Sequence, residues 1–428
     1  MLIEFSVANF RSILERQTLK MAASTYFKEL ESLNTFTPDQ SDSLPRLLRS
    51  TVLYGPNASG KSTLIQALRF VQDQVLNSQK ESQAGDQIEV VPFKLKAASR
   101  EADSEFEVTF AEHGVRYDYG FCCNRERFTE EWLIAYPLGH AQKWFHRVFD
   151  AVADKDVYKF SKHLLGGKRQ LELWKTQTRP NALFFSTAIQ LNNEQLKPAY
   201  DWFKFRLRAI DYTRGFSPSY TLKRCANDAD RSRIVAFMNS ADLSIADILV
   251  KEIAFSAELL PKGMPAAVRD EFVKDMAGKK MLEPRFFHKE VDTQASVEFD
   301  DAEESDGTRA LFAFAGPWMD VIENDLVLVV DELDTSLHPL LVHHLVKRLH
   351  HEGGKAQLIF TTHDTTLLSQ KLLRRDQVWF IEKDDRRASR LYPLSDFSPR
   401  DGEAIERGYL NGRYGGIPFL KDLDFDGI

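Results

Sequence analysis

Short apolar runs alternate with helical apolar patterns along much of the chain. Residues 2–10 combine alternation with an apolar run, and residues 51–54 and 326–330 are short, mostly apolar runs, which predicts three strands. The segments 63–76, 305–322 and 338–350 carry the periodicity of helices, while 357–364 and 377–383 are further strand candidates. This alternation predicts an α/β fold with a mostly parallel sheet covered on both faces.

Two stretches depart from that alternation. From about 91 to 135 the apolar positions recur every second residue around Glu112, His113 and Gly114, which predicts an antiparallel hairpin extension. From about 170 to 280 the pattern favours helices separated by turns. We therefore expect an N-terminal lobe over 1–169, an inserted helical subdomain over 170–285 and a C-terminal lobe over 286–428. The strand-like SVEFD segment would return the chain to the sheet.

Composition narrows the classes of protein. The net charge is -7, so no overall positive field attracts nucleic acid, and 43% hydrophobic residues suffice for a large core. The three cysteines, Cys122, Cys123 and Cys225, lack metal-ligand spacing, which suits a reducing compartment. No apolar run approaches the roughly 18 residues that a membrane span needs. We expect a soluble cytoplasmic protein that does not bind membranes.

The segment GPNASGKS matches the phosphate-binding loop G-x-x-x-x-G-K-[ST] and lies between a predicted strand and a predicted helix. Its glycines allow a tight turn that directs backbone N–H groups and a helix N-terminus at phosphate oxygens. The lysine would contact the β/γ-phosphates and the serine would ligate Mg²⁺, so the expected ligands are ATP and Mg²⁺. The predicted nucleotide-binding residues are Gly55, Pro56, Asn57, Ala58, Ser59, Gly60, Lys61, Ser62 and Thr63.

A pair of carboxylates, Asp331 and Glu332, ends the apolar run 326–330. A buried central strand presents its last residues at the ligand-binding edge of the sheet, so Asp331 is expected to hold Mg²⁺. Glu332 is then placed to take a proton from the water that attacks the γ-phosphate. A solvated acidic turn is the simpler interpretation, and the upstream phosphate loop argues against it.

Two weaker signals lie near this pair. Ser305 and Gly307 begin a predicted helix, where a hydroxyl and backbone N–H groups could bind a γ-phosphate or only cap the helix. His363 follows a predicted buried strand, where it could sense the γ-phosphate or merely be solvated.

The order GPNASGKS, ESDGTRAL, LVLVVDELDTSLHP and IFTTHD resembles the head domains of ABC ATPases of the SMC, Rad50 and RecF group. The resemblance implies an ABC-type P-loop head with a mixed sheet. It makes Ser305 and Gly307 signature residues, Asp334 a D-loop residue and His363 the switch histidine. Through the opening ANFRS it places Arg11 near the nucleotide. Asp306 and Thr308 depart from the usual signature, and no glutamine could be assigned to the Q-loop.

In that group the signature of one head reaches the γ-phosphate held by another, so the resemblance implies a homodimer or higher oligomer with ATP between the heads. The segments VVPFKL, NALFFSTAIQLN and NGRYGGIPFL further resemble compact bacterial ATPases of the AAA15 and AAA21 type. Members occur in anti-phage defence, including abortive-infection pairs and the PARIS system. The implied partners are a separately encoded Toprim-type nuclease or toxin effector and a phage-protein trigger.

Two other functions stay open. A RecF-like DNA-repair ATPase would need a basic face, for which Lys204, Arg206, Arg208 and Arg214, interleaved with aromatic residues, are candidates; a buried helix face is the favoured interpretation. A nuclease within the chain is disfavoured because only about 65 residues follow His363. The terminal Asp422, Asp424 and Asp426 resemble a solvated acidic tail more than a metal site.

Overall fold

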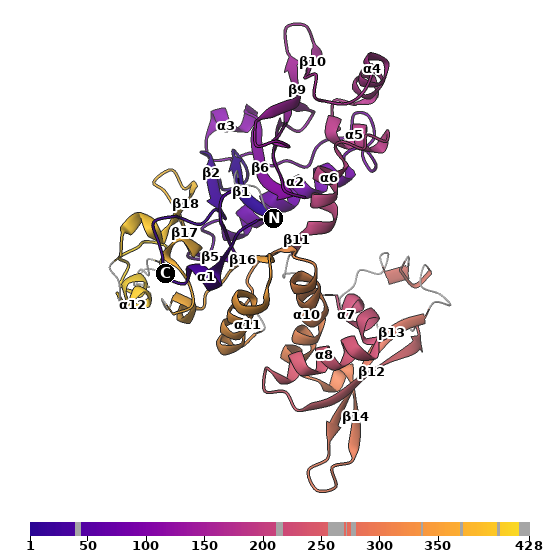
Figure 1. Ribbon diagram of the computed structural model, residues 1–428, viewed down its shortest axis with the longest axis vertical. Coiled ribbons are helices and arrows are strands. Elements are labelled where there is room, and N and C mark those ends of the chain that lie inside the picture. The colour runs from indigo at the N-terminus through magenta and orange to yellow at the C-terminus, as the bar shows by residue number, and fades with distance from the viewer. Residues whose placement is uncertain are drawn as a thin grey trace, which may run out of the picture. The chain divides into compact units, whose positions relative to one another are not determined.

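The computed structural model describes residues 1–38, 44–210, 217–255, 269–270, 272–274, 280–334, 337–368, 371–399 and 403–418 (Figure 1). Arg214 and the three aspartates of the terminal tail lie outside these residues. The chain forms two units, which we describe separately. The first contains Met1–Thr213, Val321–Asp334 and Val342–Ile428, and the second contains Arg214–Asp320 and Thr335–Leu341.

A six-stranded sheet of order β11-β15-β16-β5-β17-β18 forms the centre of the first unit. Its neighbouring strands are parallel except for β18, which runs antiparallel to β17. Every residue of β5, β15 and β16 is buried, as the continuous apolar runs predicted. The strands are β5 (Ser50–Tyr54), β11 (Leu207–Ile210), β15 (Val327–Val330), β16 (Gln357–Thr361), β17 (Val378–Lys383) and β18 (Ser389–Pro393).

A seven-stranded antiparallel sheet of order β10-β9-β8-β7-β6-β1-β2 is the second layer of this unit. The β6–β7 turn consists of His113 and Gly114, whose φ angles of 50° and 76° suit the two-residue hairpin predicted there. The strands are β1 (Leu2–Ala8), β2 (Gln17–Lys20), β6 (Ser104–Glu112), β7 (Val115–Cys123), β8 (Phe128–Ala135), β9 (Gln142–Asp150) and β10 (Lys155–Phe160).

One buried amide joins the two sheets. Gln357, at the start of β16, accepts a hydrogen bond from the Leu2 N–H at 2.6 Å and donates to the Leu2 and Leu48 carbonyls at 3.0 and 3.2 Å. Helix α2 (Lys61–Asn77) contributes Leu64 and Leu68 to an apolar core shared with residues of both sheets. The sheets and α2 therefore form one continuous core.

The segment expected to be a separate helical subdomain is divided between the two units. Its first part belongs to the first unit, because the buried Glu131 carboxylate on β8 accepts hydrogen bonds from the N–H groups of Phe184 and Phe185 at 2.7 and 2.9 Å. The elements held there are α4 (Lys168–Gln177), α5 (Phe184–Gln190), α6 (Lys197–Asp201) and the π-helix η1 (Trp202–Arg206).

The second unit is also not purely helical. Its three-stranded antiparallel sheet has the order β12-β13-β14 and packs on helices α7 and α8 (Figure 1). Phe286 of β13 contacts Phe312 of α10, with ring centroids 5.4 Å apart. The elements are α7 (Ser219–Cys225), α8 (Asp228–Asn239), β12 (Ile245–Ala254), β13 (Lys280–Lys289), β14 (Ser296–Asp300), η4 (Asp301–Glu303) and α10 (Asp306–Glu323), the last ending in the first unit. The SVEFD segment is strand β14, as predicted, but its neighbour is β13 rather than a strand of the parallel sheet.

The remaining elements complete the edges of the first unit and the connections. They are α1 (Glu31–Asn34), β3 (Thr35–Phe36), β4 (Leu47–Leu48), α3 (Ala97–Glu101), α11 (Pro339–Glu352), η5 (Thr365–Leu368), η6 (Arg375–Gln377), η7 (Leu394–Phe397) and α12 (Ile405–Leu410). Among the helices of the described residues, none has the length and apolar character needed to cross a bilayer. The mixed sheet with an antiparallel extension confirms the predicted α/β fold class.

Candidate nucleotide-binding site

The phosphate loop lies between β5 and α2, with Lys61 as the first residue of the helix. Ala58 and Gly60 have φ angles of 62° and 113°, so the loop turns through conformations that favour glycine. A Cβ atom on Gly60 would lie 2.2 Å from the Ser389 hydroxyl oxygen. Glycine is therefore required here by both the backbone and the neighbouring strand β18.

Lys61 is buried at the base of this loop. Its ammonium donates to the Gly55 carbonyl at 2.7 Å and to the Pro56 carbonyl at 3.4 Å. Burial lowers the pKa of Lys61, and the nearby carboxylates Glu332, Asp331 and Asp334 partly oppose that shift. The structure thus brings together the lysine and all three acidic residues that the sequence singled out.

The acidic pair follows β15, and Thr361 of the neighbouring β16 fixes its position. The Thr361 hydroxyl donates to Asp331 Oδ1 at 2.7 Å and accepts from the Glu332 N–H at 2.6 Å. Glu332 has a φ of 53°, a conformation that costs a non-glycine residue free energy and is concentrated at functional sites. The sequence motif did not reveal Thr361, although it lies within the IFTTHD segment.

A further contact links the loop after β15 to the loop after β16. The His363 N–H donates to Asp334 Oδ2 at 3.1 Å, while the His363 side chain is exposed. Asp334 Oδ1 is buried and has no hydrogen-bond partner among the described residues. Tyr54, the last residue before the phosphate loop, donates to the Asp364 carbonyl at 2.7 Å. Three adjacent parallel strands therefore end in connected loops at one edge of the sheet.

Arg11 follows strand β1, and its contacts are with Val91 and Phe10. Its N–H donates to the Val91 carbonyl at 2.7 Å, and its exposed guanidinium lies over the Phe10 ring at 5.5 Å. The next residue, Ser12, contacts the phosphate-loop helix instead, because its hydroxyl donates to Thr63 at 3.0 Å. A role for Arg11 in nucleotide binding stays a prediction.

Ser305 and Gly307 belong to the second unit. The exposed Ser305 hydroxyl accepts from the Thr308 N–H at 3.1 Å, as a helix cap does, and Gly307 is the second residue of α10. The preceding Glu304 is held by His288 of β13, with 2.6 Å between Oε1 and Nε2. The Ser305 hydroxyl also lies 2.9 Å from that of Thr308, and the signature role of Ser305 stays a prediction.

The residues present fit a nucleoside triphosphate with Mg²⁺. The Ser59 hydroxyl is buried without a hydrogen-bond partner among the described residues, and Lys61 contacts the loop's own carbonyls. Ser62 and Asp331 offer the hydroxyl and carboxylate oxygens that Mg²⁺ prefers. Within the described residues no three His, Cys, Asp or Glu side chains gather as a metal site.

The fold and the loop define a P-loop nucleotide-binding domain. Residues 50–369 match the family model AAA_21, described as "AAA domain, putative AbiEii toxin, Type IV TA system", and the chain belongs to this family. This confirms the AAA21 resemblance seen in the sequence.

Two solved structures are similar in fold at low scores. The SMC head domain from Thermotoga maritima shares 12% identity, with 92% of this chain and 98% of that chain covered and a TM-score of 0.39. The SMC head bound to the C-terminal winged-helix domain of ScpA shares 11% identity, with 93% and 99% covered and a TM-score of 0.39. These scores add nothing to the assignment of the site. No curated protein matched the chain in sequence.

Proposed function

We propose that the chain is an ATPase whose composite ATP sites form between two copies, and that it is the sensor of an abortive-infection defence system controlling a separately encoded nuclease or toxin. The observation that carries the ATPase proposal is the convergence of Lys61, Asp331 and Glu332 at one edge of the parallel sheet. Ligands of open α/β sheets bind at this edge.

Each residue of the cluster has a distinct chemical task. The Lys61 ammonium binds the β/γ-phosphates, and Ser62 and Asp331 would hold Mg²⁺, which neutralises charge on phosphate oxygens. Glu332 accepts a proton from the attacking water while the water oxygen forms a bond to the γ-phosphorus. The bond between that phosphorus and the bridging oxygen breaks, which yields ADP and inorganic phosphate.

The second copy supplies the remaining contacts. Its Ser305 hydroxyl and the N–H groups around Gly307, at the N-terminus of α10, donate to the γ-phosphate. Asp334 and His363 join the D-loop and switch loop through the hydrogen bond between them, so loss of the phosphate can affect both loops together. ATP therefore favours the closed dimer and hydrolysis favours its opening.

The ATPase proposal is tested by steady-state hydrolysis. Lys61→Ala should abolish ATP binding and turnover, whereas Glu332→Gln should bind ATP, lose at least about 100-fold in turnover and accumulate as a dimer in mass photometry. Lys159→Met, at an exposed position of β10, is the charge-matched control and should behave as wild type. Wild-type turnover in Glu332→Gln would exclude Glu332 as the base.

Support for the defence role comes from the family, whose description names a toxin of a type IV toxin–antitoxin system. Co-expression with the neighbouring gene in cells challenged with phage tests this role. We expect protection or toxicity that disappears with Lys61→Ala. An effect that is indifferent to Lys61 would show that nucleotide binding is not the control.

The same assays distinguish a DNA-processing ATPase. The structure weakens the proposed basic surface, because Trp202 and Phe203 are buried and Arg206 is bound to Glu112 at 3.1 Å and to the Asn324 carbonyl at 2.7 Å. Hydrolysis stimulated by DNA in a salt-dependent manner would favour that function over defence.

A further inference from the structure

A chain of hydroxyl groups connects the phosphate-loop helix to a lysine on another strand. The Thr63 hydroxyl lies 3.0 Å from that of Ser12, which lies 2.8 Å from that of Ser389. The Ser389 hydroxyl oxygen in turn lies 3.1 Å from the Lys383 ammonium. The Ser59 carbonyl of the phosphate loop is a second acceptor for Ser389, at 2.5 Å.

The backbone fixes this chain in place. Lys383 and Ser389 face each other across the antiparallel pair β17 and β18. The Asp384 carboxylate accepts from the Arg386 and Ala388 N–H groups, both at 2.9 Å, and so closes the hairpin between them. The Ser389 N–H donates to the Ser12 carbonyl at 2.7 Å, which holds β18 beside the end of β1.

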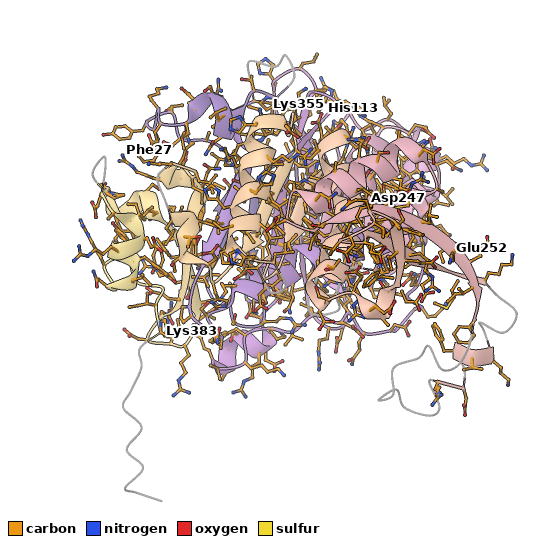
Figure 2. The ribbon with its side chains drawn as sticks, turned by 90° about the horizontal axis from the view of Figure 1, so that it is seen from below. Phe27, His113, Asp247, Glu252, Lys355 and Lys383 are labelled. Carbon is orange, nitrogen blue, oxygen red and sulfur yellow. The ribbon has the colours of Figure 1, made fainter. Side chains whose placement is uncertain are left out.

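Lys383 is not occupied by an ion pair. Its ammonium has no carboxylate within salt-bridge distance in the part of the chain that the structure describes, and its polar contact is the Ser389 hydroxyl. Lys383 is exposed as a whole residue, but partial desolvation of its ammonium lowers its pKa, with Asp384 partly opposing the shift. Figure 2 labels Lys383 at the surface of the molecule, in agreement with its exposed side chain. The Lys383 ammonium, close to the phosphate loop, thus has no ion-pair partner among the described residues.

We propose that Lys383 is a second cation of the nucleotide site and acts on it through the Ser389 hydroxyl, which contacts the phosphate loop at the Ser59 carbonyl. This inference rests on the proposed nucleotide binding. The Ser389 hydroxyl accepts from the Lys383 ammonium, and its single hydrogen faces both the Ser59 carbonyl of the phosphate loop at 2.5 Å and the Ser12 hydroxyl at 2.8 Å. Lys383 is a positioning residue, because it orients the Ser389 hydroxyl beside the phosphate loop without touching the phosphate.

The position of these hydroxyl groups also predicts which phosphates of the nucleotide depend on Lys383. Thr63 lies inside the first turn of α2, beyond Lys61, and the phosphate-loop backbone and helix N-terminus cradle the α- and β-phosphates that ATP and ADP share. Neutralising Lys383 should therefore weaken the binding of ATP and the binding of ADP by similar factors. Loss of a γ-phosphate contact would instead weaken the binding of ATP alone.

Equilibrium titrations with MANT-ATP and MANT-ADP test the proposal in the full chain. Lys383→Met and Ser389→Ala should each raise both dissociation constants about 5-fold, which is the usual size of one ordinary hydrogen bond, because Lys383 acts indirectly. Because both residues act in one chain, the double variant should be no weaker than the weaker single variant. Lys383→Arg should restore most of the affinity, and Lys159→Met should match wild type.

Three results would overturn the proposal. Unchanged affinity in Lys383→Met excludes the second cation, and multiplicative losses in the double variant exclude transmission through Ser389. A loss confined to MANT-ATP excludes the assignment to the shared phosphates. If wild type itself binds neither probe, the proposed function fails first. Because Lys383→Met changes an exposed side chain, its titrations test the second cation even if Ser389→Ala does not fold.

Discussion

His350 shows how a single buried residue fixes the strand that leads to the phosphate loop. Its Nε2 lies 2.8 Å from the hydroxyl of Ser50, the first residue of β5. Gln377 donates to the same hydroxyl at 2.8 Å and to the Ser50 carbonyl at 2.9 Å. Burial lowers the pKa of His350 to about 3, because a charged imidazole would lose its hydration there.

This shift predicts a stability that depends on pH. The unfolded chain protonates His350 as the pH falls below about 6.5, whereas the folded protein does not until about 3, so the stabilisation present above pH 6.5 is lost as the pH falls through that window. Between pH 7.5 and 5.0 this one residue should remove about 2 kcal/mol from the free energy of unfolding. Urea unfolding of wild type and His350→Gln at both values measures the difference. Equal losses in the two proteins would contradict the prediction.

At this scale the sequence predicted the residues of contiguous motifs and missed those that meet across the fold. Lys61 could be located because it belongs to the contiguous phosphate-loop motif, and Asp331 and Glu332 could be located because they directly follow an apolar run. Ser389 could not, since it reaches the phosphate loop from 330 positions away and its own surroundings in the sequence carry no motif. Arg11 was chosen over Ser12 although the serine makes the contact with the helix.

Among the elements, α5 is held by buried charged groups as well as by its apolar residues in the core. Arg147, which is fully buried, lies 3.9 Å from Glu131 Oε2, donates to Asp156 at 2.8 Å and donates to the Ala182 carbonyl at 2.7 Å. Glu131 holds the N-terminus of α5 through two N–H groups. Burial raises the pKa of Glu131, and the Arg147 cation opposes that shift. The carboxylate and the guanidinium thus form the joint between the antiparallel sheet and α5.

Removing one charged partner of this Glu131–Arg147 pair should lower the stability of the folded protein. Arg147→Met leaves Glu131 and Asp156 without their shared cation, which should lower the free energy of unfolding by about 3–5 kcal/mol. The double variant Glu131→Gln, Arg147→Met should be less destabilised than Arg147→Met alone, because the uncompensated charge at Glu131 is gone. Chemical denaturation of the three proteins measures both effects. A double variant less stable than Arg147→Met would show that packing, not charge, dominates.

The boundaries of the inserted region could not be predicted, because the contacts that set them come from residues distant in the sequence. The helices up to Arg206 have ordinary helical periodicity, and the group that attaches α5 to the first unit lies about 50 residues upstream on β8. Residues 245–254 carry an apolar pattern that suits either a helix or a strand, and their pairing with β13 decides for the strand. The antiparallel hairpin was predictable because its alternation and its turn residues are local.

For the whole molecule, a site shared between two copies predicts complementation. Lys61→Ala and Ser305→Arg should each abolish hydrolysis, since a dimer of two identical variant chains contains no intact ATP site. An equimolar mixture should regain roughly a quarter of the wild-type sites, because half of the dimers are mixed and each has one intact site of two. Hydrolysis in the mixture measures this recovery. Activity no greater than the mean of the two variants would indicate that each chain works alone.

The strand order also governs how the protein is made. Strand β5 lies between β16 and β17, and Leu2 bonds to Gln357 across 355 positions. After the ribosome has added Tyr54, it must add about 300 more residues before these neighbours exist, which takes roughly 15–60 s at ordinary elongation rates. Until then the apolar strand has no partner on either side, so the nascent chain depends on chaperones throughout that interval. Ribosome-bound chains stalled before residue 357 should be cut readily within residues 50–54 by a protease that spares the finished protein.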